Sequence, residues 1–270
     1  MFAKLFTVAA LSAGALATIR TCGTEEPSDA HRAMSKQMAA NEKAGNLTIQ
    51  AIPTVDVYFH VVAAGSTEAK GYIPEAKMNA QFEYLEEAYA PYGITFNLVD
   101  IDYTINTDWA SDGAEIEMKQ ALRQGDYSTL NFYFVNDLGN LLGYCYFPDD
   151  VTEGTRAFYK DGCTILSSSV PGGATANYNL GGTAVHESGH WFGLYHTFQG
   201  GCTGDGDEID DTPAQASSTS GCPSSRDSCP NQAGDDPIHN YMDYSYDECY
   251  EEYTDDQVTR MNSMWSQYRS

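Results

Sequence analysis

Residues 186–196 read His-Glu-Ser-Gly-His-Trp-Phe-Gly-Leu-Tyr-His, and this spacing of three histidines constrains the fold more than any other feature of the sequence. His186 and His190 are four positions apart, so on a helix their side chains project from one face, one turn apart. Gly193 lets the chain leave that helix, because glycine tolerates positive φ. His196 can then return toward the same point. The pattern therefore predicts a helix, a sharp turn and three imidazoles that converge.

Three converging imidazoles are suited to bind a zinc ion and to leave its fourth position open, as in catalytic rather than structural zinc sites. Glu187 lies one step round the helix, where its carboxylate can act as a general base on a water at the metal. The alternative is a polar helix face with solvated histidines. The apolar residues Trp191, Phe192 and Leu194 argue against it, because they suit a helix that packs beneath a cleft.

A second motif lies downstream, where residues 239–245 read His-Asn-Tyr-Met-Asp-Tyr-Ser. Alone it is weak, because a methionine most often fills a gap in a core. After the long histidine motif, a methionine in a tight turn is the second signature of the metzincins. The chain thus resembles the metzincin metalloproteases, within them the pappalysin family, and is similar to its secreted fungal extracellular metalloproteases. The resemblance runs from about Val55 to the C-terminus and also rests on residues 200–202, 211–213, 221–223, 227–230, Cys249, Gln257, Arg260 and Met261.

The resemblance implies a role for each residue of these motifs. It implies one zinc ion per chain, bound by His186, His190 and His196. It makes Glu187 the general base of a metal-assisted amide hydrolysis, places Met242 in the turn below the metal, and gives Tyr244 a part in stabilising the oxyanion. The implied function is that of a secreted zinc-dependent endopeptidase acting on proteins or peptides.

Hydrophobic periodicity outlines the rest of the fold. It predicts strands at 55–62, 94–101, 130–135, 141–147 and 164–168, and helices at 74–90 and 115–123. This order predicts a mixed twisted sheet with helices packed on it. The resemblance implies that the fold is α/β (α+β), metzincin-like, with the mixed twisted sheet plus helices in an N-terminal lobe. The zinc helix, expected to begin near 179–183, precedes an irregular, disulfide-stapled C-terminal lobe that ends in a helix capped by Thr254 and Gln257. In metzincins one antiparallel strand forms the rim of the cleft, and the sequence leaves open which of the last two strands it is.

The first fifty residues differ in character from the rest. Residues 1–18 combine Lys4, an apolar run and a small-x-small cleavage pattern, which predicts a secretory signal peptide; the alternative is a buried helix or membrane anchor. Residues 19–50 are interpreted as an N-terminal extension or propeptide, with a helix from Ser28 to about Lys43 and a glycosylation acceptor at Asn46. The catalytic domain is predicted at 51–270, with an upper lobe of about 51–193 and a lower lobe of about 194–270.

A formal charge of −24 argues against nucleic acid as a partner, because nucleic-acid binding needs a basic face. Beyond the signal, no stretch is apolar enough to span a membrane. We also expect a monomer.

Several carboxylates lie close together in loop 204–212, which predicts a calcium site. Its expected ligands are Asp205, Asp207, Asp210 and Asp211. The alternative is a solvated acidic loop.

The chain has seven cysteines, and a secreted context favours disulfides. The six in the catalytic region can pair in many ways, which the sequence alone leaves open. The resemblance favours Cys202–Cys229 and Cys222–Cys249, and Cys145–Cys163 is the remaining pair.

Cys22 is the odd cysteine and lies just past the predicted signal. A thiolate is a strong zinc ligand, so an unpaired cysteine in an N-terminal extension could fill the open zinc position and keep the enzyme latent. The resemblance implies such a cysteine switch. The alternative is a free or intermolecular thiol in a flexible leader.

The sequence constrains the substrate specificity less than it constrains the metal site. Asp247 follows the methionine turn, and the resemblance places it on the wall of the pocket for the residue after the cut bond, where a buried carboxylate selects Arg or Lys. The alternative is a surface aspartate in an acid-rich stretch.

Two other functions stay open. One is an exopeptidase, although nothing marks a terminus-binding site. The other is a non-catalytic zinc- or calcium-binding module, which would not need Glu187. Neither the natural substrate nor the maturation site follows from the sequence.

Overall fold

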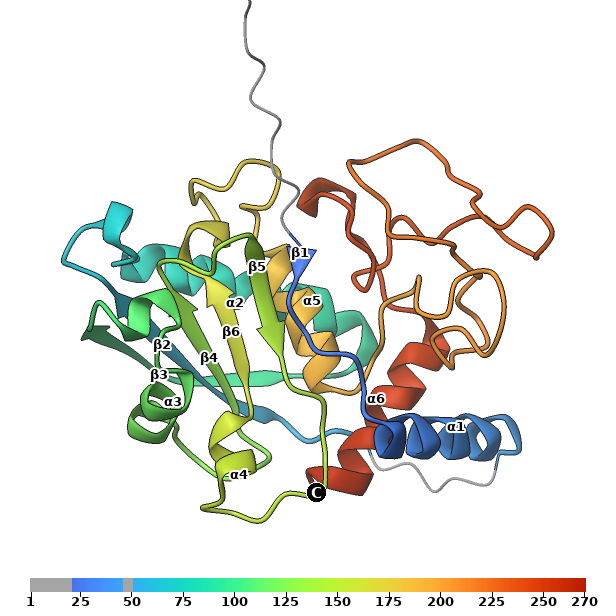
Figure 1. The fold of residues 1–270 in the computed structure, drawn as a ribbon, viewed down its shortest axis with the longest axis horizontal. Coiled ribbons are helices and arrows are strands. Elements are labelled where there is room, and N and C mark those ends of the chain that lie inside the picture. Colours follow the sequence, from blue (N-terminus) through green and yellow to red (C-terminus); the bar gives the residue numbers. More distant parts are fainter. Residues whose placement is uncertain (1–20, 46–50) are drawn as a thin grey trace, which may run out of the picture.

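A mixed sheet with helices on both faces dominates the computed structural model, which describes residues 21–45 and 51–270 (Figure 1). The strands are β1 (Thr21–Cys22), β2 (Val55–Ala63), β3 (Phe96–Ile105), β4 (Leu130–Val135), β5 (Leu141–Cys145) and β6 (Cys163–Leu166). The helices are α1 (Asp29–Lys43), α2 (Glu75–Tyr89), α3 (Glu115–Leu122), α4 (Arg156–Lys160), α5 (Gly182–Trp191) and α6 (Asp255–Tyr268). The predicted signal peptide and Asn46 lie outside the described residues.

The sheet has the strand order β1-β5-β6-β4-β2-β3. Strands β3, β2, β4 and β6 run parallel, whereas β5 pairs antiparallel with β6. The N-terminal strand β1 pairs parallel with the other edge of β5. The structure therefore identifies β5 as the antiparallel strand, and a segment from the N-terminal extension covers its free edge.

Alternate side chains of the central strands are buried on opposite faces, because successive residues of a strand point to opposite sides of the sheet. On β4, Phe132 and Phe134 join the core beneath α2 and α5, whereas Tyr133 and Val135 join a second core beside α3. Every residue of β4 is buried, as expected for a strand covered on both faces. The resulting layers hold α5 rigidly under the edge of β5.

The C-terminal part of the chain is mostly irregular between α5 and α6. Three disulfides are formed, and they join Cys145 to Cys163, Cys202 to Cys229 and Cys222 to Cys249. Two of them cross-link the loops between α5 and α6, which have little regular structure of their own. Helix α6 begins with the predicted capping box, in which Thr254 accepts from the amide of Gln257 and the Gln257 side chain accepts from the amide of Thr254.

The predicted fold class, a mixed sheet with helices followed by a disulfide-stapled lobe, is confirmed. Each predicted strand and helix is present, with ends that differ by a few residues. The short helix α4 was not predicted, because five residues give too little periodicity to recognise. Within the two described ranges, no helix has the length and apolar character needed to cross a bilayer.

Candidate active site

The three motif histidines come from α5 and the turn that follows it. His186 and His190 lie on α5, and Gly193 adopts a φ of 97° as the chain turns away. The Nδ1 atom of His186 lies 2.6 Å from the carbonyl oxygen of Tyr241, and that of His190 lies 2.7 Å from the carbonyl oxygen of Leu194. A carbonyl oxygen only accepts, so each Nδ1 carries the proton. The lone pair of each imidazole is therefore on Nε2.

These Nε2 atoms converge. The Nε2 atoms of His190 and His196 are 3.1 Å apart, and the Nε2 of His186 is buried without a hydrogen-bond partner among the described residues. Burial lowers the pKa of His186 to about 4, so its imidazole is neutral. Burial also holds the pKa values of His190 and His196 well below the ordinary value, so all three imidazoles are neutral. Three neutral imidazoles, two of them with fixed tautomers, and an orphaned nitrogen fit a divalent metal that prefers nitrogen ligands.

Glu187 lies beside this cluster and is only 1% exposed. Burial raises the pKa of Glu187 to about 8, although hydrogen bonds from Cys22 and Thr24 act against the shift. A carboxyl group whose pKa lies near neutrality can both take up and release a proton. The geometry thus places an acid–base group next to the three imidazoles.

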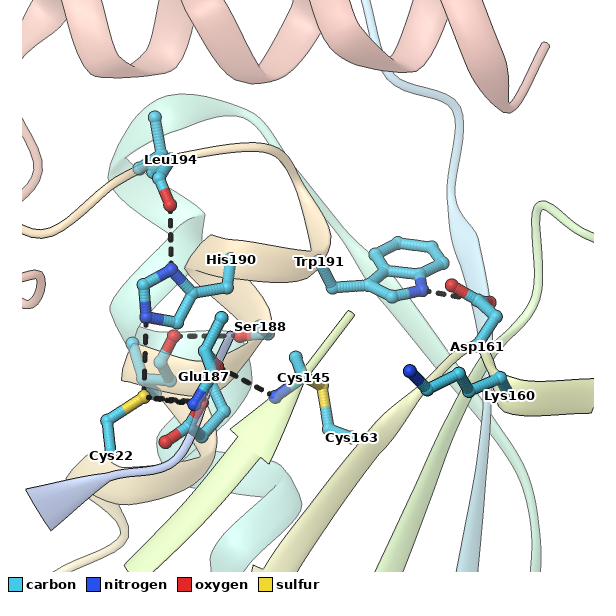
Figure 2. Close-up of a disulfide and its surroundings, with 12 residues drawn as sticks. Cys22, Cys145, Lys160, Asp161, Cys163, Glu187, Ser188, His190, Trp191 and Leu194 are labelled. Carbon is cyan, nitrogen blue, oxygen red and sulfur yellow. Dashed lines mark hydrogen bonds between the residues drawn. A yellow bond between two sulfur atoms is a disulfide. The ribbon is translucent and has the colours of Figure 1, made fainter. Parts of the chain in front are cut away.

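The N-terminal extension contacts the same carboxylate (Figure 2). The thiol of Cys22 donates to Oε2 of Glu187 at 3.3 Å and lies 3.5 Å from Nε2 of His190. The ligand atoms of Cys22 and the three histidines all lie within 4.8 Å of one another, and the described residues contain no other such group of three or more metal-binding side chains. Cys22 is also the one cysteine outside the disulfides.

Thr24, which was not predicted as a site residue, also contacts the Glu187 carboxylate. Its hydroxyl donates to Oε2 of Glu187 at 3.0 Å and accepts from the amide of Cys145 at 3.0 Å. It therefore connects the extension both to the carboxylate and to β5. A hydroxyl two residues after an unpaired cysteine was the only hint in the sequence.

Met242 packs against α5, and Tyr244 lies next to His196. Met242 is fully buried, and a Cβ added to Gly189 of α5 would be 2.3 Å from its sulfur. Only a glycine at position 189 thus lets the methionine pack directly under the helix. The Tyr244 hydroxyl lies 3.2 Å from Nε2 of His196, and burial raises its pKa above the ordinary value.

Asp247 lines a pocket next to His186 and Glu187, together with Thr183 and Tyr250. Its Oδ2 accepts from the amides of residues 180, 181 and 182 at 2.8, 3.2 and 3.3 Å, whereas Oδ1 is buried without a partner among the described residues. Burial raises the pKa of Asp247 to about 6, opposed by the three amides. The residue is 3% exposed, so it is not a surface aspartate.

The carboxylates of the acidic loop do not converge on one point. Asp205 and Asp210 form ion pairs with Lys36 and Lys43 of α1, and Asp211 accepts from the amide of residue 256. Asp207 is buried, which raises its pKa to about 7, and it accepts from Thr212. Calcium binding by this loop stays a prediction.

Comparisons with known proteins agree with this geometry. The sequence profile of the pregnancy-associated plasma protein-A family of peptidases matches residues 129–266. An extracellular metalloprotease of Neurospora crassa is 55% identical over an alignment of 278 positions, which covers 99% of this chain and 98% of that protein. One of Colletotrichum graminicola is 57% identical over 254 residues, which cover 92% of this chain and 90% of that protein. Mature mirolysin of Tannerella forsythia, solved in complex with a cleaved peptide, has a TM-score of 0.63 and 30% identity, covering 81% of this chain and 92% of its own.

The matched region contains the histidine motif, the methionine turn and the disulfide-linked loops between them. The relatives match nearly the whole chain, including the N-terminal extension. The resemblance inferred from the motifs is confirmed. This chain therefore belongs to the pappalysin family, the peptidases related to pregnancy-associated plasma protein-A, and it is a metalloprotease.

Proposed function

We propose that the protein is a secreted zinc-dependent endopeptidase, made as a latent precursor. The observation that carries this proposal is the convergence of three neutral imidazoles beside a buried carboxylate whose polar contacts come from the N-terminal extension. Secretion is supported by the predicted signal peptide and by relatives named extracellular metalloproteases. The proposed metal ligands are His186, His190 and His196.

The roles of the side chains follow from their positions. When bound, zinc would supply Lewis acidity, polarising the attacked carbonyl and lowering the pKa of a water molecule. Oε2 of Glu187 takes the proton of the attacking water and later delivers it to the leaving amine. The Tyr244 hydroxyl donates a hydrogen bond to the developing oxyanion. Met242 supports the histidines from below and takes no part in proton transfer.

Residues 19–50 act in this proposal as a prosegment, and Cys22 keeps the catalytic domain, residues 51–270, latent. Burial and the Glu187 carboxylate raise the pKa of the Cys22 thiol, so it donates to that carboxylate unless a cation lies beside it. A coordinated cation would deprotonate the thiol. In both cases Cys22 occupies the position from which water would attack. Strand β1 at the same time covers the edge of β5, where a substrate would add as an extra strand.

We further propose that Asp247 selects a basic residue directly after the cut bond. Its Oδ2 is held by three backbone amides, which fixes the carboxylate, while Oδ1 stays without a partner in the pocket. A buried acceptor of this kind is satisfied by a guanidinium or ammonium group of a substrate. The other pocket walls are largely apolar, which suits the methylene stem of such a side chain.

The function is tested with the full chain carrying Cys22→Ala and a peptide blocked at both ends. We expect cleavage that stops with a chelator and returns with zinc, and no cleavage when Glu187→Ala is added although zinc stays bound. Glu83→Ala, at an exposed position of α2, is the matched control and should cleave normally. Undiminished cleavage by the Glu187 variant would refute the assigned role, and cleavage only of unblocked peptides would favour an exopeptidase.

Specificity is tested separately with a library of blocked peptides. We expect Arg or Lys to be enriched after the cut bond, and Asp247→Asn to abolish that enrichment. Equal enrichment in both proteins would remove Asp247 from the proposal and leave the hydrolytic function intact.

A further inference from the structure

Helix α1 of the N-terminal extension docks on the catalytic domain beside α6 (Figure 1). Its docked face carries His31, Ser35, Met38 and Glu42. The Ser35 hydroxyl lies 2.9 Å from the hydroxyl of Tyr195, and Glu42 accepts from the guanidinium of Arg260 at 2.9 Å. An isolated helix of this length is marginal in water. Helix α1 therefore depends on this interface for its structure.

His31 is the titratable group at the centre of the interface, and it is 6% exposed. Three aromatic rings surround its imidazole. Their centroids lie 5.0, 5.7 and 6.5 Å from the centroid of the His31 ring, for Phe147, Tyr195 and Tyr268 respectively. The ring thus bridges the extension, the segment after β5, the turn after α5 and the end of α6.

The hydrogen bonding of His31 suits only the neutral imidazole. Nδ1 lies 3.1 Å from the carbonyl oxygen of Pro148, which only accepts, so Nδ1 carries the proton. Nε2 is buried and has no partner among the described residues. A second proton would place a charged donor on the buried Nε2, and a buried donor without an acceptor is costly.

The charged groups that face His31 do not offset this cost. Asp149 favours the protonated ring, whereas Arg32 of α1 and Arg260 of α6 disfavour it. An open pocket reaches His31 between residues 25–28 and 145–149, and Glu25 and Glu26 also line it. The pocket brings solvent to the edge of the interface, whereas Nε2 itself is buried.

We infer that His31 is an acid-sensitive latch, whose protonation releases helix α1 from the catalytic domain and so weakens the hold of the extension on the active site. The inference rests on the proposed function, because release of α1 regulates catalysis only if Cys22 and β1 block a catalytic site. Residues 23–28 connect α1 directly to that strand. Without α1, the described contacts of residues 21–28 with the catalytic domain are a two-residue strand, the Thr24 contacts, the thiol and exposed polar contacts of Glu25 with Lys160 and of Glu26 with Gln199.

The direction of the effect follows from linkage. Burial lowers the pKa of His31 from 6.5 to about 4, although the Pro148 hydrogen bond opposes the shift. The docked state therefore binds fewer protons than the released state. Docking has its full strength above pH 6.5 and weakens as the pH falls toward 4. From these two pKa values, linkage predicts that the equilibrium constant for docking of α1 on the catalytic domain falls roughly thirty-fold between about pH 7.5 and pH 5.

Amide hydrogen exchange of the full chain, followed by mass spectrometry, tests the latch. Peptides covering residues 29–43 are compared at the two pH values in the natural chain and in His31→Phe, which keeps an aromatic ring but does not titrate. Both chains keep Cys22 and the three zinc histidines, so acid effects at the metal site cancel in the ratio. We expect protection of α1 in the natural chain to fall roughly thirty-fold more than in His31→Phe.

Two more variants serve as controls, one for the fit of phenylalanine and one for the pH dependence of docking. His31→Asn retains a donor for Pro148 and should behave like His31→Phe, which covers the case in which phenylalanine does not fit. Lys36→Gln breaks an ion pair on the same helix and should weaken docking equally at both pH values. The same pH-dependent loss of protection in the natural chain and in either His31 variant would overturn the inference. None of these readouts needs hydrolysis, so a failed latch and a failed catalytic proposal are distinguishable.

Discussion

The buried carboxylate of Asp161 holds the end of the active-site helix, and its removal offers a quantitative test of the structure. Asp161 is 2% exposed and accepts from Arg269 at 2.9 Å and from Arg123 at 3.3 Å. It also accepts from the indole of Trp191 at 3.2 Å (Figure 2). Arg269 also donates to the carbonyl oxygen of Trp191, the last residue of α5. One carboxylate therefore joins α5, α3 and the C-terminus.

The substitution Asp161→Asn keeps the shape of the side chain and removes its charge. Two guanidinium groups, each 1% exposed, are then left without a compensating anion. Removing one partner of a buried ion pair costs about 3–5 kcal/mol. Because about 1 kcal/mol shifts the Tm of a protein near this size by roughly 2–4 °C, we expect Tm to fall by roughly 6–20 °C.

Thermal unfolding followed by circular dichroism, with the disulfides intact, measures this change. The matched control is Asp150→Asn, an identical substitution at an exposed position, which should leave Tm nearly unchanged. Burial raises the pKa of Asp161, but Arg269 and Arg123 outweigh burial and hold it below its ordinary value. Its contribution is therefore present at neutral pH and lost in strong acid, where the two proteins should converge. A drop in Tm of less than about 2 °C at neutral pH would refute the reasoning.

Three further substitutions test separate parts of the structure. Gly189→Ala brings a Cβ to 2.3 Å from the sulfur of Met242, so overpacking should cost about 1–3 kcal/mol, and an unchanged Tm would contradict the packing. Cys222→Ser opens the Cys222–Cys249 link, which spans 27 residues, and should lower the free energy of unfolding by about 3–4 kcal/mol in urea titrations; equal midpoints would argue against that disulfide. Cys22→Ser should raise the hydrolysis of a blocked peptide by the full chain, and unchanged activity would count against latency.

Features that depend on neighbours along the chain could be predicted without the structure. The spacing of His186, His190 and His196 around Gly193 specifies a helix and a turn, because helical periodicity relates residues four apart. The capping box of Thr254 and Gln257 is local in the same sense, as is the alternation at 55–62 that predicted the strand β2. These local rules, together with the family resemblance, were enough to predict the fold class and to nominate the candidate site.

Contacts between residues far apart in the sequence became known only from the folded chain. It identified β5 as the antiparallel strand, brought Thr24 to Glu187, and gathered Arg123, Arg269 and Trp191 around Asp161. It also paired two carboxylates of the acidic loop, Asp205 and Asp210, with the lysines of α1. These contacts join positions tens to hundreds of residues apart, and no periodicity relates such positions. They arise only when the burial of apolar faces fixes how the helices, the sheet and the extension pack.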